Sequence, residues 1–534
     1  MNTPIYDFVE AYRESDAVRL HMPGHKGVAG PLGVEPFDIT EIEGADVLSQ
    51  PCGIIAESEA NAGSLFGCRT IYSTEGSSLC VRAMVLLLKR MALHRGVTPR
   101  ILAARNVHRS FLDAVALLDV EVDWIMPKAV GDSKAYAYES CEISGEELAQ
   151  MIAQLRERGR MPSAVYITSP DYLGNCTDVS ALAEVCHSNG CFLAVDNAHG
   201  AYLKFLPESA HPMDHGADLC CDSAHKTLPV LTGGAYLHIS RNTDPYLTEH
   251  ATRAMAMFAT TSPSYLILQS LDLCNAYLEE NTAAFEQTAR RVAQLREELM
   301  RTGYRITGDE PWKITLVVED EPESGKEDKA TAFSDGDMLA EILGKYGIVV
   351  EYHDFDHVVL MFSAQTTEGE FALVGSVLTE IAEDRKWKAE KKKEAESKDA
   401  EQPVKDGAED VTKSSGTSGK SGEEPGAENG EETEKEPEKE PKEESGAASG
   451  TASLAERIPV PLQVLTPAEA ILAESEYVDA SQCVGRVLAE PLVHMPPCVP
   501  VYMCGEVLGE DAVRYVRGRV RVVKEPVRGD RRNR

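Results

Sequence analysis

The chain has 534 residues, which is enough for two or three domains and for an interior that buries a large cofactor. Its formal net charge of -34 argues against nucleic acid or an anionic membrane as the main partner and is compatible with cationic substrates. The 13 cysteines are scattered and odd in number, so they indicate reduced thiols and exclude a small disulfide scaffold.

The first 24 residues carry acidic side chains and lack the apolar core of a secretory signal. No apolar stretch approaches the roughly 20 residues that a membrane-spanning helix needs. We therefore expect a cytoplasmic protein that contacts neither membrane nor nucleic acid.

Residues 1–310 are predicted to form an N-terminal segment and a large α/β domain. Short apolar runs at 164–168, 191–195 and 235–239 alternate with helical patterns such as the one at 179–190. This alternation is typical of a mostly parallel sheet covered by helices.

Three further regions are predicted after the large domain. Residues 311–387 have the pattern strand, helix, strand, strand, helix, which indicates a small α+β subdomain. Residues 388–453 are rich in Glu, Lys, Ser, Gly and Pro, which predicts a disordered acidic linker or insertion. Residues 454–534 are predicted to form a separate C-terminal unit, whose first helix has Thr466 as N-cap and Pro467 at N1.

Two polar features in the first half of the large domain are candidates for ligand binding or catalysis. After the predicted strand TIYST, the turn Glu75-Gly76-Ser77-Ser78 opens a helix, and its amides and hydroxyls suit a phosphate. After the predicted strand ILAARN, His108 is placed where an imidazole can stack on an aromatic ring. Taken alone, His108 is better interpreted as a satisfied core histidine.

Two more groups lie further along the chain. Asp196 ends the buried run CFLAVD, where open α/β sheets place their ligand crevice, and a protonated pyridine nitrogen is a suitable partner for it. Lys226 lies in DSAHKTLP among small and hydroxyl residues; in a pocket of low polarity such a lysine forms an imine with an aldehyde. Taken alone, Lys226 is better interpreted as a surface lysine in a loop.

The order of these groups is informative. A phosphate turn, a stacking histidine, a strand-end aspartate and a lysine about 30 residues later form the arrangement of fold-type-I pyridoxal-phosphate (PLP) enzymes. The sequence therefore predicts an enzyme that holds pyridoxal 5'-phosphate.

Five motifs follow one another along the chain: HMPGHKG (21–27), DITEIEGADVL (38–48), DNAHGAY (196–202), DSAHKTLP (222–229) and TTSPSY (260–265). With MPPCVPVYMCGE (495–506) near the C-terminus, they resemble the Orn/Lys/Arg decarboxylase family. The resemblance implies a PLP-dependent carboxy-lyase that forms a homodimer or a higher homo-oligomer.

The resemblance also implies roles for the matching residues. Lys226 would hold the cofactor as a Schiff base, Asp196 would bond its pyridine nitrogen and His108 would stack on its ring. His199 would lie near the phenolic side of the ring. Further cofactor-binding residues would be Gly76, Ser77, Ser78, Ser223 and His225, with Thr260 reaching the phosphate of a partner subunit. Three groups are open as the donor that returns a proton to the substrate: His199, His225 and Lys226.

Some residues depart from the pattern of the family. Asn197 stands where an acid is common, Tyr202 where a histidine is common, and Glu75 where an asparagine usually precedes the phosphate turn. Cys498 and Cys504 replace an expected glycine and proline. The lysine and the aspartate are retained, so these departures bear on substrate choice and efficiency.

Other interpretations stay open. An aminotransferase would share Lys226 and Asp196, but it generally clamps its substrate with an arginine in the small domain, and none occurs at 312–384. A PLP-fold protein without catalysis, acting in regulation, is a second alternative. No metal site is expected, because His187 between Cys186 and Cys191 fits core packing better than zinc.

The substrate is predicted to be a basic amino acid, namely arginine, lysine or ornithine. Its distal cation would need a carboxylate, and the candidates are Glu506, Asp354, Asp356 and Asp46. Polyamine biosynthesis is the natural context, although a degradative or acid-resistance role would use the same chemistry.

Overall fold

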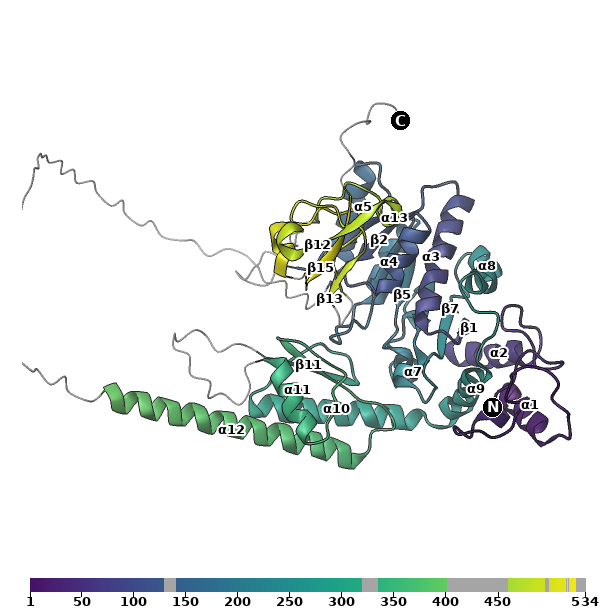
Figure 1. The fold of residues 1–534 in the computed structure, drawn as a ribbon, viewed down its shortest axis with the longest axis horizontal. Helices are drawn as coiled ribbons and strands as arrows, with labels where there is room; N and C mark the ends of the chain where they lie inside the picture. Colours follow the sequence, from purple (N-terminus) through teal and green to yellow (C-terminus); the bar gives the residue numbers. More distant parts are fainter. Residues whose placement is uncertain are drawn as a thin grey trace, which may run out of the picture.

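The computed structural model describes residues 1–128, 141–318, 335–400, 460–494, 499–514, 516 and 518–524. Figure 1 shows a large domain, a smaller subdomain that carries the long helix α12 (Glu368–Ala400), and a C-terminal unit beside the large domain. Within these residues, no helix is both long and apolar enough to cross a bilayer.

A seven-stranded sheet forms the centre of the large domain. Its order is β1-β7-β6-β5-β4-β2-β3, and only β7 is antiparallel to its neighbours. The predicted α/β domain with a mostly parallel sheet is confirmed. The strands are β1 (Arg69–Ser73), β2 (Arg100–Ala104), β3 (Glu121–Ile125), β4 (Ala164–Thr168), β5 (Phe192–Asp196), β6 (Leu219–Asp222) and β7 (Ala235–Ile239).

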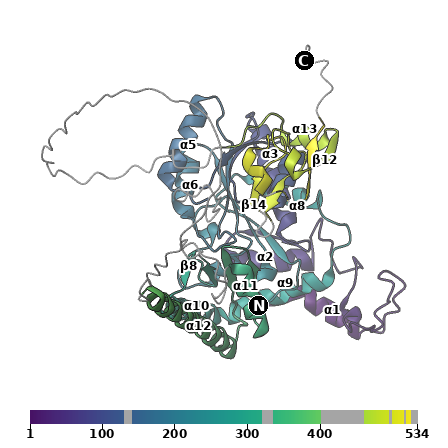
Figure 2. The same ribbon diagram turned by 60° about the vertical axis from the view of Figure 1, so that its left-hand side comes forward.

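Helices cover both faces of this sheet, with α3 and α8 on one face and α5 and α6 on the other (Figure 2). Helix α4 packs beside α3 (Figure 1). At the β1 end, α1, α2 and α9 pack together beside β1 and β7. The helices are α1 (Pro4–Glu14), α2 (Ile54–Phe66), α3 (Ser77–His94), α4 (Arg109–Leu117), α5 (Gly145–Glu157), α6 (Val179–Ser188), α7 (Ala224–Thr227), α8 (Pro245–Ala256), α9 (Tyr265–Glu280) and α10 (Thr282–Thr302).

The central strand β5 shows why the sheet is buried on both sides. Leu193 and Val195 pack against the α5 and α6 side, whereas Phe192 and Ala194 pack against the α3 side. Successive side chains of a strand point to opposite faces, so a continuous apolar run serves two helix layers. The polar residue that ends the strand, Asp196, is left at the carboxyl edge of the sheet.

The small subdomain is built on a four-stranded antiparallel sheet with the order β10-β11-β9-β8. Helix α12 packs along α10, as Figure 2 shows. The elements are β8 (Arg305–Thr307), β9 (Lys313–Val317), α11 (Gly336–Lys345), β10 (Tyr352–His353), β11 (His357–Met361) and α12 (Glu368–Ala400).

Two details of this subdomain bear on its predicted limits. Strand β8 lies before residue 311 yet pairs with β9, so the sheet begins earlier than the predicted boundary. Helix α12 continues to Ala400, past the predicted start of the linker at residue 388, because its charged residues are good helix formers. The rest of the predicted linker, 401–453, lies outside the described residues.

The C-terminal unit consists of two antiparallel strand pairs and one short helix. Thr466 caps the helix and forms a reciprocal capping box with Glu469, which confirms the predicted start. The elements are α13 (Pro467–Leu472), β12 (Ser475–Asp479), β13 (Leu492–His494), β14 (Val499–Tyr502) and β15 (Arg519–Val523).

Candidate active site

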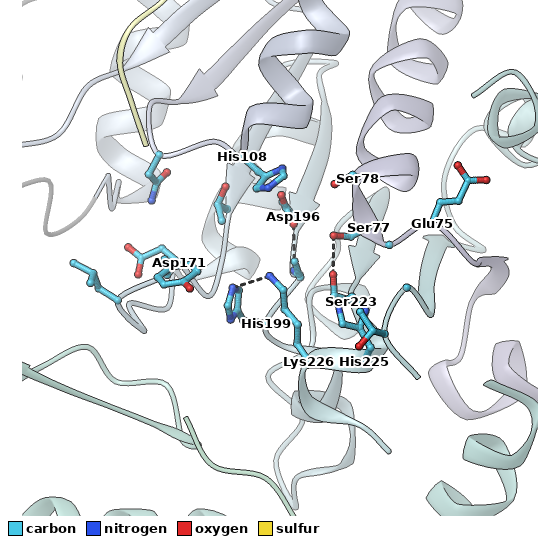
Figure 3. A pocket seen from close by; sticks show the side chains of 18 residues that line it. Glu75, Ser77, Ser78, His108, Asp171, Asp196, His199, Ser223, His225 and Lys226 are labelled. Atoms are coloured by element: carbon cyan, nitrogen blue, oxygen red, sulfur yellow. Dashed lines mark hydrogen bonds between the residues drawn. The ribbon is translucent and has the colours of Figure 1, made fainter. Parts of the chain in front are cut away.

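A cavity of about 410 Å³ lies at the carboxyl edge of the parallel strands, as expected for an open α/β sheet. Figure 3 shows its polar side chains converging from several elements. The lining residues are Glu75, Gly76, Ser77, Ser78, Asn106, His108, Thr168, Asp171, Tyr172, Leu173, Asp196, Ala198, His199, Ser223, His225, Lys226, Thr232 and Gly233.

Lys226 projects into this cavity from the one-turn helix α7, which follows β6 directly. Its Nζ lies 3.0 Å from Nε2 of His199. Burial lowers the pKa of Lys226; Asp196 opposes this shift and Lys313 adds to it. A lowered pKa favours the neutral amine, the form that attacks an aldehyde.

Asp196 is 2% exposed at the end of β5. Its Oδ1 accepts a hydrogen bond from the backbone amide of Ala198 at 3.2 Å, and its Oδ2 accepts one from the hydroxyl of Tyr166 at 3.3 Å. The carboxylate is therefore oriented by its own loop and by β4. It lies among the lining residues, where it can accept a further bond from a cationic ring nitrogen.

The turn before α3 has the properties of an anion site. Its N-cap, Gly76, has φ 71°, and no side chain caps the 18-residue helix. The backbone amide of Gly76 donates to the carbonyl of Gly233 at 2.7 Å, and Oγ of Ser223 donates to Oγ of Ser77 at 2.7 Å. Gly76, Ser77, Ser78 and Ser223 all line the cavity, so the start of α3 and these hydroxyls can bind an anion there.

The two remaining histidines that the sequence singled out, besides His199, also line the cavity. His108 is the N-cap of α4, and its Nδ1 accepts from the backbone amide of Ser110 at 3.2 Å. Nδ1 of His225 lies 3.0 Å from the carbonyl of Gly234. Figure 3 shows Ser77, Ser78 and Ser223 on one side of Lys226, and His199 and Asp171 on the other.

The sequence reasoning missed several residues of the cavity wall. Asn106 follows β2, Thr168 ends β4, and Asp171 and Tyr172 lie in the loop after β4. Asp196 was predicted because ligands bind at the carboxyl ends of the strands in an open α/β sheet. The same rule applies to the ends of β2 and β4, so it could have identified these positions.

The first 321 residues carry the decisive match. Residues 3–321 match the model of the family described as "Orn/Lys/Arg decarboxylase, major domain". The chain belongs to the Orn/Lys/Arg decarboxylase family. It is a PLP-dependent amino-acid decarboxylase, as the motifs indicated.

Relatives of this decarboxylase match most of its length. An arginine decarboxylase of Bacillus subtilis (strain 168) is 25% identical, and the match covers 96% of this chain and 93% of the relative. The constitutive lysine decarboxylase of Escherichia coli (strain K12) is 21% identical over 77% of this chain and 61% of its own length.

Solved structures share the fold. The E. coli constitutive lysine decarboxylase superposes with a TM-score of 0.66 at 17% identity, covering 98% of this chain and 82% of the other. The lysine decarboxylase of Francisella novicida gives a TM-score of 0.68 at 16% identity, covering 98% of this chain and 81% of the other.

The cavity of the enzyme fits the cofactor. Within the described residues, Oδ1 of Asn106 and Oγ1 of Thr168 are buried without a hydrogen-bond partner, and both residues line the cavity. Buried polar atoms are normally satisfied, so these two indicate a missing polar ligand. With the uncapped α3 terminus for a phosphate and Asp196 for a ring nitrogen, the donor set suits pyridoxal phosphate.

Glu506, a predicted substrate residue, lies outside the lining of this cavity. It is fully buried and accepts two hydrogen bonds from Arg105, at 2.9 and 2.7 Å. Its carboxylate is therefore already neutralised by a bidentate partner, and it is not a lining residue.

The other three predicted substrate residues do not line the cavity either. Asp354 accepts from the backbone amide of His357 at 2.6 Å in the turn between β10 and β11, and Asp356 lies in the same turn. Asp46 accepts from the amides of Cys52, Gly53 and Ile55, and so braces the start of α2. The carboxylates of Asp46 and Asp354 thus bond nearby backbone amides, and Asp354 and Asp356 lie in the small subdomain.

Thr260 also lies outside the cavity lining. Its backbone amide donates to Oε1 of Glu75 at 2.7 Å, so it contacts the residue that precedes the phosphate turn. The predicted role in a partner subunit's phosphate site stays a prediction.

Proposed function

We propose that this decarboxylase acts on a basic amino acid, with arginine as the first candidate, and releases the corresponding amine. The observation that carries the proposal is the convergence of Lys226, Asp196 and the uncapped terminus of α3 on one cavity. Several relatives that match 96% of this chain are named arginine decarboxylase, which favours arginine. The cationic product would suit polyamine biosynthesis.

The proposed roles follow from position. Lys226 would bind the cofactor covalently and Asp196 would keep its pyridine nitrogen protonated, while His108 would stack on its ring. When bound, pyridoxal phosphate supplies an electron sink for the charge left by the departing carbon dioxide. The phosphate would be held by the first turn of α3 and by Ser77, Ser78, Ser223 and His225.

Asp171 supports a cationic substrate. It lines the cavity, is 6% exposed, and accepts hydrogen bonds from Asn175 at 2.9 Å to each oxygen, with a further backbone bond from Leu173. The nearby ammonium of Lys313 bonds the backbone carbonyl of Asp171 and forms its ion pair with Glu310. Burial raises the pKa of Asp171 to about 6, against the hydrogen bonds of Asn175. A substrate cation would stabilise this desolvated carboxylate.

Lys226→Ala tests the reaction. We expect the wild type to show the visible absorbance of bound pyridoxal phosphate and to release carbon dioxide from arginine, lysine or ornithine. Lys226→Ala should lose both, whereas Lys345→Ala, which removes an exposed lysine of α11, should keep both. Amino transfer to a keto acid without carbon dioxide release would refute decarboxylation.

Asp171→Asn tests the substrate class. Removing a charge-assisted contact of about 1.5–3 kcal/mol should raise the KM for the basic substrate roughly 10- to 100-fold without weakening cofactor retention. Asp356→Asn removes the same charge outside the cavity and should leave the KM unchanged. Equal KM values for Asp171→Asn and the wild type would remove Asp171 from substrate recognition.

We further propose a cytoplasmic homodimer. The loop after α1 exposes apolar side chains that a partner would cover: Val18 is 81%, Leu20 89% and Leu32 81% exposed. The described cysteines are free, which suits a reducing compartment. Light scattering should show a dimer for the purified enzyme and a monomer for Leu20→Glu. A monomeric wild type would refute the homodimer, and a dimer in both would show that the loop is not the interface.

A further inference from the structure

A lysine of the small subdomain reaches the back of the active site. Lys313, the first residue of β9, is 1% exposed. Its Nζ lies 2.6 Å from Oε2 of Glu310, 3.3 Å from the carbonyl of Asp171 and 3.5 Å from Nδ1 of His199. An ammonium has three hydrogens and no lone pair, so it cannot accept a hydrogen from any of these three groups.

His199 lies between two lysines. It is 4% exposed, with Nε2 at 3.0 Å from Nζ of Lys226 and Nδ1 facing Lys313. The edge of its ring meets Tyr172, with the ring centroids 5.1 Å apart. A hydrogen on Nδ1 would face the ammonium of Lys313, which is repulsive, so Nδ1 carries the lone pair and Nε2 the hydrogen.

We propose that Lys313 is a positioning residue, which holds His199 as the neutral tautomer with its hydrogen on Nε2 and thereby orients the amine of Lys226. The hydrogen on Nε2 donates to Nζ of Lys226, so the imidazole fixes the direction of the amine without adding a charge. The small subdomain thus contributes to the active site through His199.

The charges around His199 agree with a neutral ring. The pKa of His199 is held well below its usual value, first by burial and then by Lys226 and Lys313. The titratable groups that act most on the ring are Lys226, Lys313, His108 and His225, and Tyr172 meets its edge. Asp171 and Asp196 line the same cavity, but the ring's hydrogen bonds within the described residues go to the two lysines, so no carboxylate bonds an imidazolium there.

Glu310 explains how a lysine is retained at this depth. It is fully buried, and the hydroxyl of Tyr202 donates to its Oε1 at 3.4 Å. Tyr202 in turn stacks on Trp312 with the ring centroids 3.9 Å apart. A buried ion pair generally stabilises a fold no more than an apolar pair of the same size does. Stability alone therefore does not explain why a lysine stands at position 313.

The tautomer also bears on which group returns a proton to the substrate carbon. A neutral His199 would become an imidazolate if it gave up its one ring hydrogen, and His225 directs its own Nδ1 hydrogen to the carbonyl of Gly234. Lys226 is left among the three candidates. The bond from His199 describes Lys226 as the neutral amine, before it takes a proton from the ammonium of the entering substrate. One N–H bond of the resulting Lys226 ammonium would then break as the C–H bond of the product forms. This consequence rests on the proposed decarboxylation.

The test compares Lys313→Arg with the double variant E310Q/K313M. Lys313→Arg keeps a cationic donor and the partner of Glu310, whereas the double variant removes both charges and leaves no unpaired buried ion. We expect the double variant to lose roughly 10- to 100-fold in kcat with the KM for arginine within about threefold, and Lys313→Arg to recover most of the loss.

Two readouts do not depend on turnover. The rate at which the apoenzyme takes up pyridoxal phosphate is followed by absorbance against pH. Its midpoint should shift upward in the double variant, because burial and the ammonium of Lys313 both lower the pKa of Lys226 and the ammonium is gone. Long-range ¹H–¹⁵N spectra of the ¹⁵N-histidine-labelled wild-type apoenzyme, assigned with His199→Asn, should show the hydrogen of His199 on Nε2.

Several results would overturn the inference. The inference fails if the spectrum shows a hydrogen on Nδ1 or a protonated ring at neutral pH, or if the uptake midpoint does not shift. The spectrum is recorded on the wild type, so it remains a test even if the double variant does not fold. If the wild type releases no carbon dioxide from any basic amino acid, the proposed function fails, while the spectrum and the uptake midpoint still judge the role of Lys313.

Discussion

At Gly233 two chain segments approach too closely for any side chain. Gly233 has φ +101°, and a Cβ there would lie 2.8 Å from the carbonyl oxygen of Thr74. Its own carbonyl accepts from the amide of Gly76, the N-cap of α3. The anion site at the start of α3 thus depends on the absence of one methyl group on the neighbouring loop.

We expect Gly233→Ala to lower the free energy of unfolding by roughly 1–3 kcal/mol, because alanine is strained at this φ and must displace Thr74. Because the turn at Gly76 moves with it, the apparent Kd for pyridoxal phosphate should rise. Thermal unfolding and cofactor titration measure both effects. Gly344→Ala in α11, where a Cβ has no neighbour within 4 Å, is the control. Equal behaviour of the two variants would contradict the prediction.

Strands β6 and β7 carry a second buried polar group, which lies beside the active site without lining it. Oδ2 of Asp222 is 3.0 Å from Nε2 of His211 and 3.1 Å from Nε2 of His238, and the three side chains are fully buried. The amide of Asn197 donates to Oδ1 of Asp222 at 2.7 Å, which connects the group to the loop after β5. Burial disfavours the charge on His238, but Cys68 and Asp222 outweigh it and raise its pKa to about 9.

This group predicts a pH dependence of stability. The folded pKa of His238 lies above its unfolded value of about 6.5, so the stabilisation is full below about pH 6.5 and is lost as the pH rises through about 9. The loss amounts to about 3 kcal/mol. Thermal unfolding between pH 6 and 10 should show it, and Asp222→Asn should destabilise the enzyme at pH 6 and flatten the profile. His353→Gln, which alters an exposed histidine, should keep the wild-type profile.

At the scale of the whole molecule, a buried ion pair within the described residues links the large domain to the C-terminal unit. Arg105 follows β2, is fully buried, and donates to both oxygens of Glu506 and to the carbonyls of Pro500 and Val501. Figure 1 shows the C-terminal unit against β2 and α4. Because the next residue, Asn106, lines the cavity, the docking of this unit also braces the cavity wall.

Glu506→Gln should therefore weaken the attachment of the C-terminal unit to the large domain. Leaving Arg105 buried without its carboxylate costs about 3–5 kcal/mol, so we expect a lower unfolding temperature and faster proteolysis of the C-terminal unit. Glu510→Gln, an exposed neighbour, should match the wild type in both measurements. An unchanged proteolysis rate for Glu506→Gln would show that other contacts hold the unit in place.

The sequence by itself determined the domain class and the side chains closest to the chemistry. Apolar runs of strand length, each ended by a polar or small residue, require a mostly parallel sheet and leave Asp196 at its carboxyl edge. Lys226 and the turn at Gly76 were recognisable because their flanking residues are small enough for a tight approach. Local spacing carries this information, since each feature spans fewer than about ten residues.

Only the tertiary structure decided which distant charges meet. Glu506 and Asp354 looked available in the sequence, yet folding pairs the first with Arg105 and seats the second in a turn of the small sheet. Lys313 gave no signal, although folding brings it to His199, 114 residues earlier in the chain. A charge finds its partner through packing across several elements, and the order of residues along one strand or turn does not contain that distance.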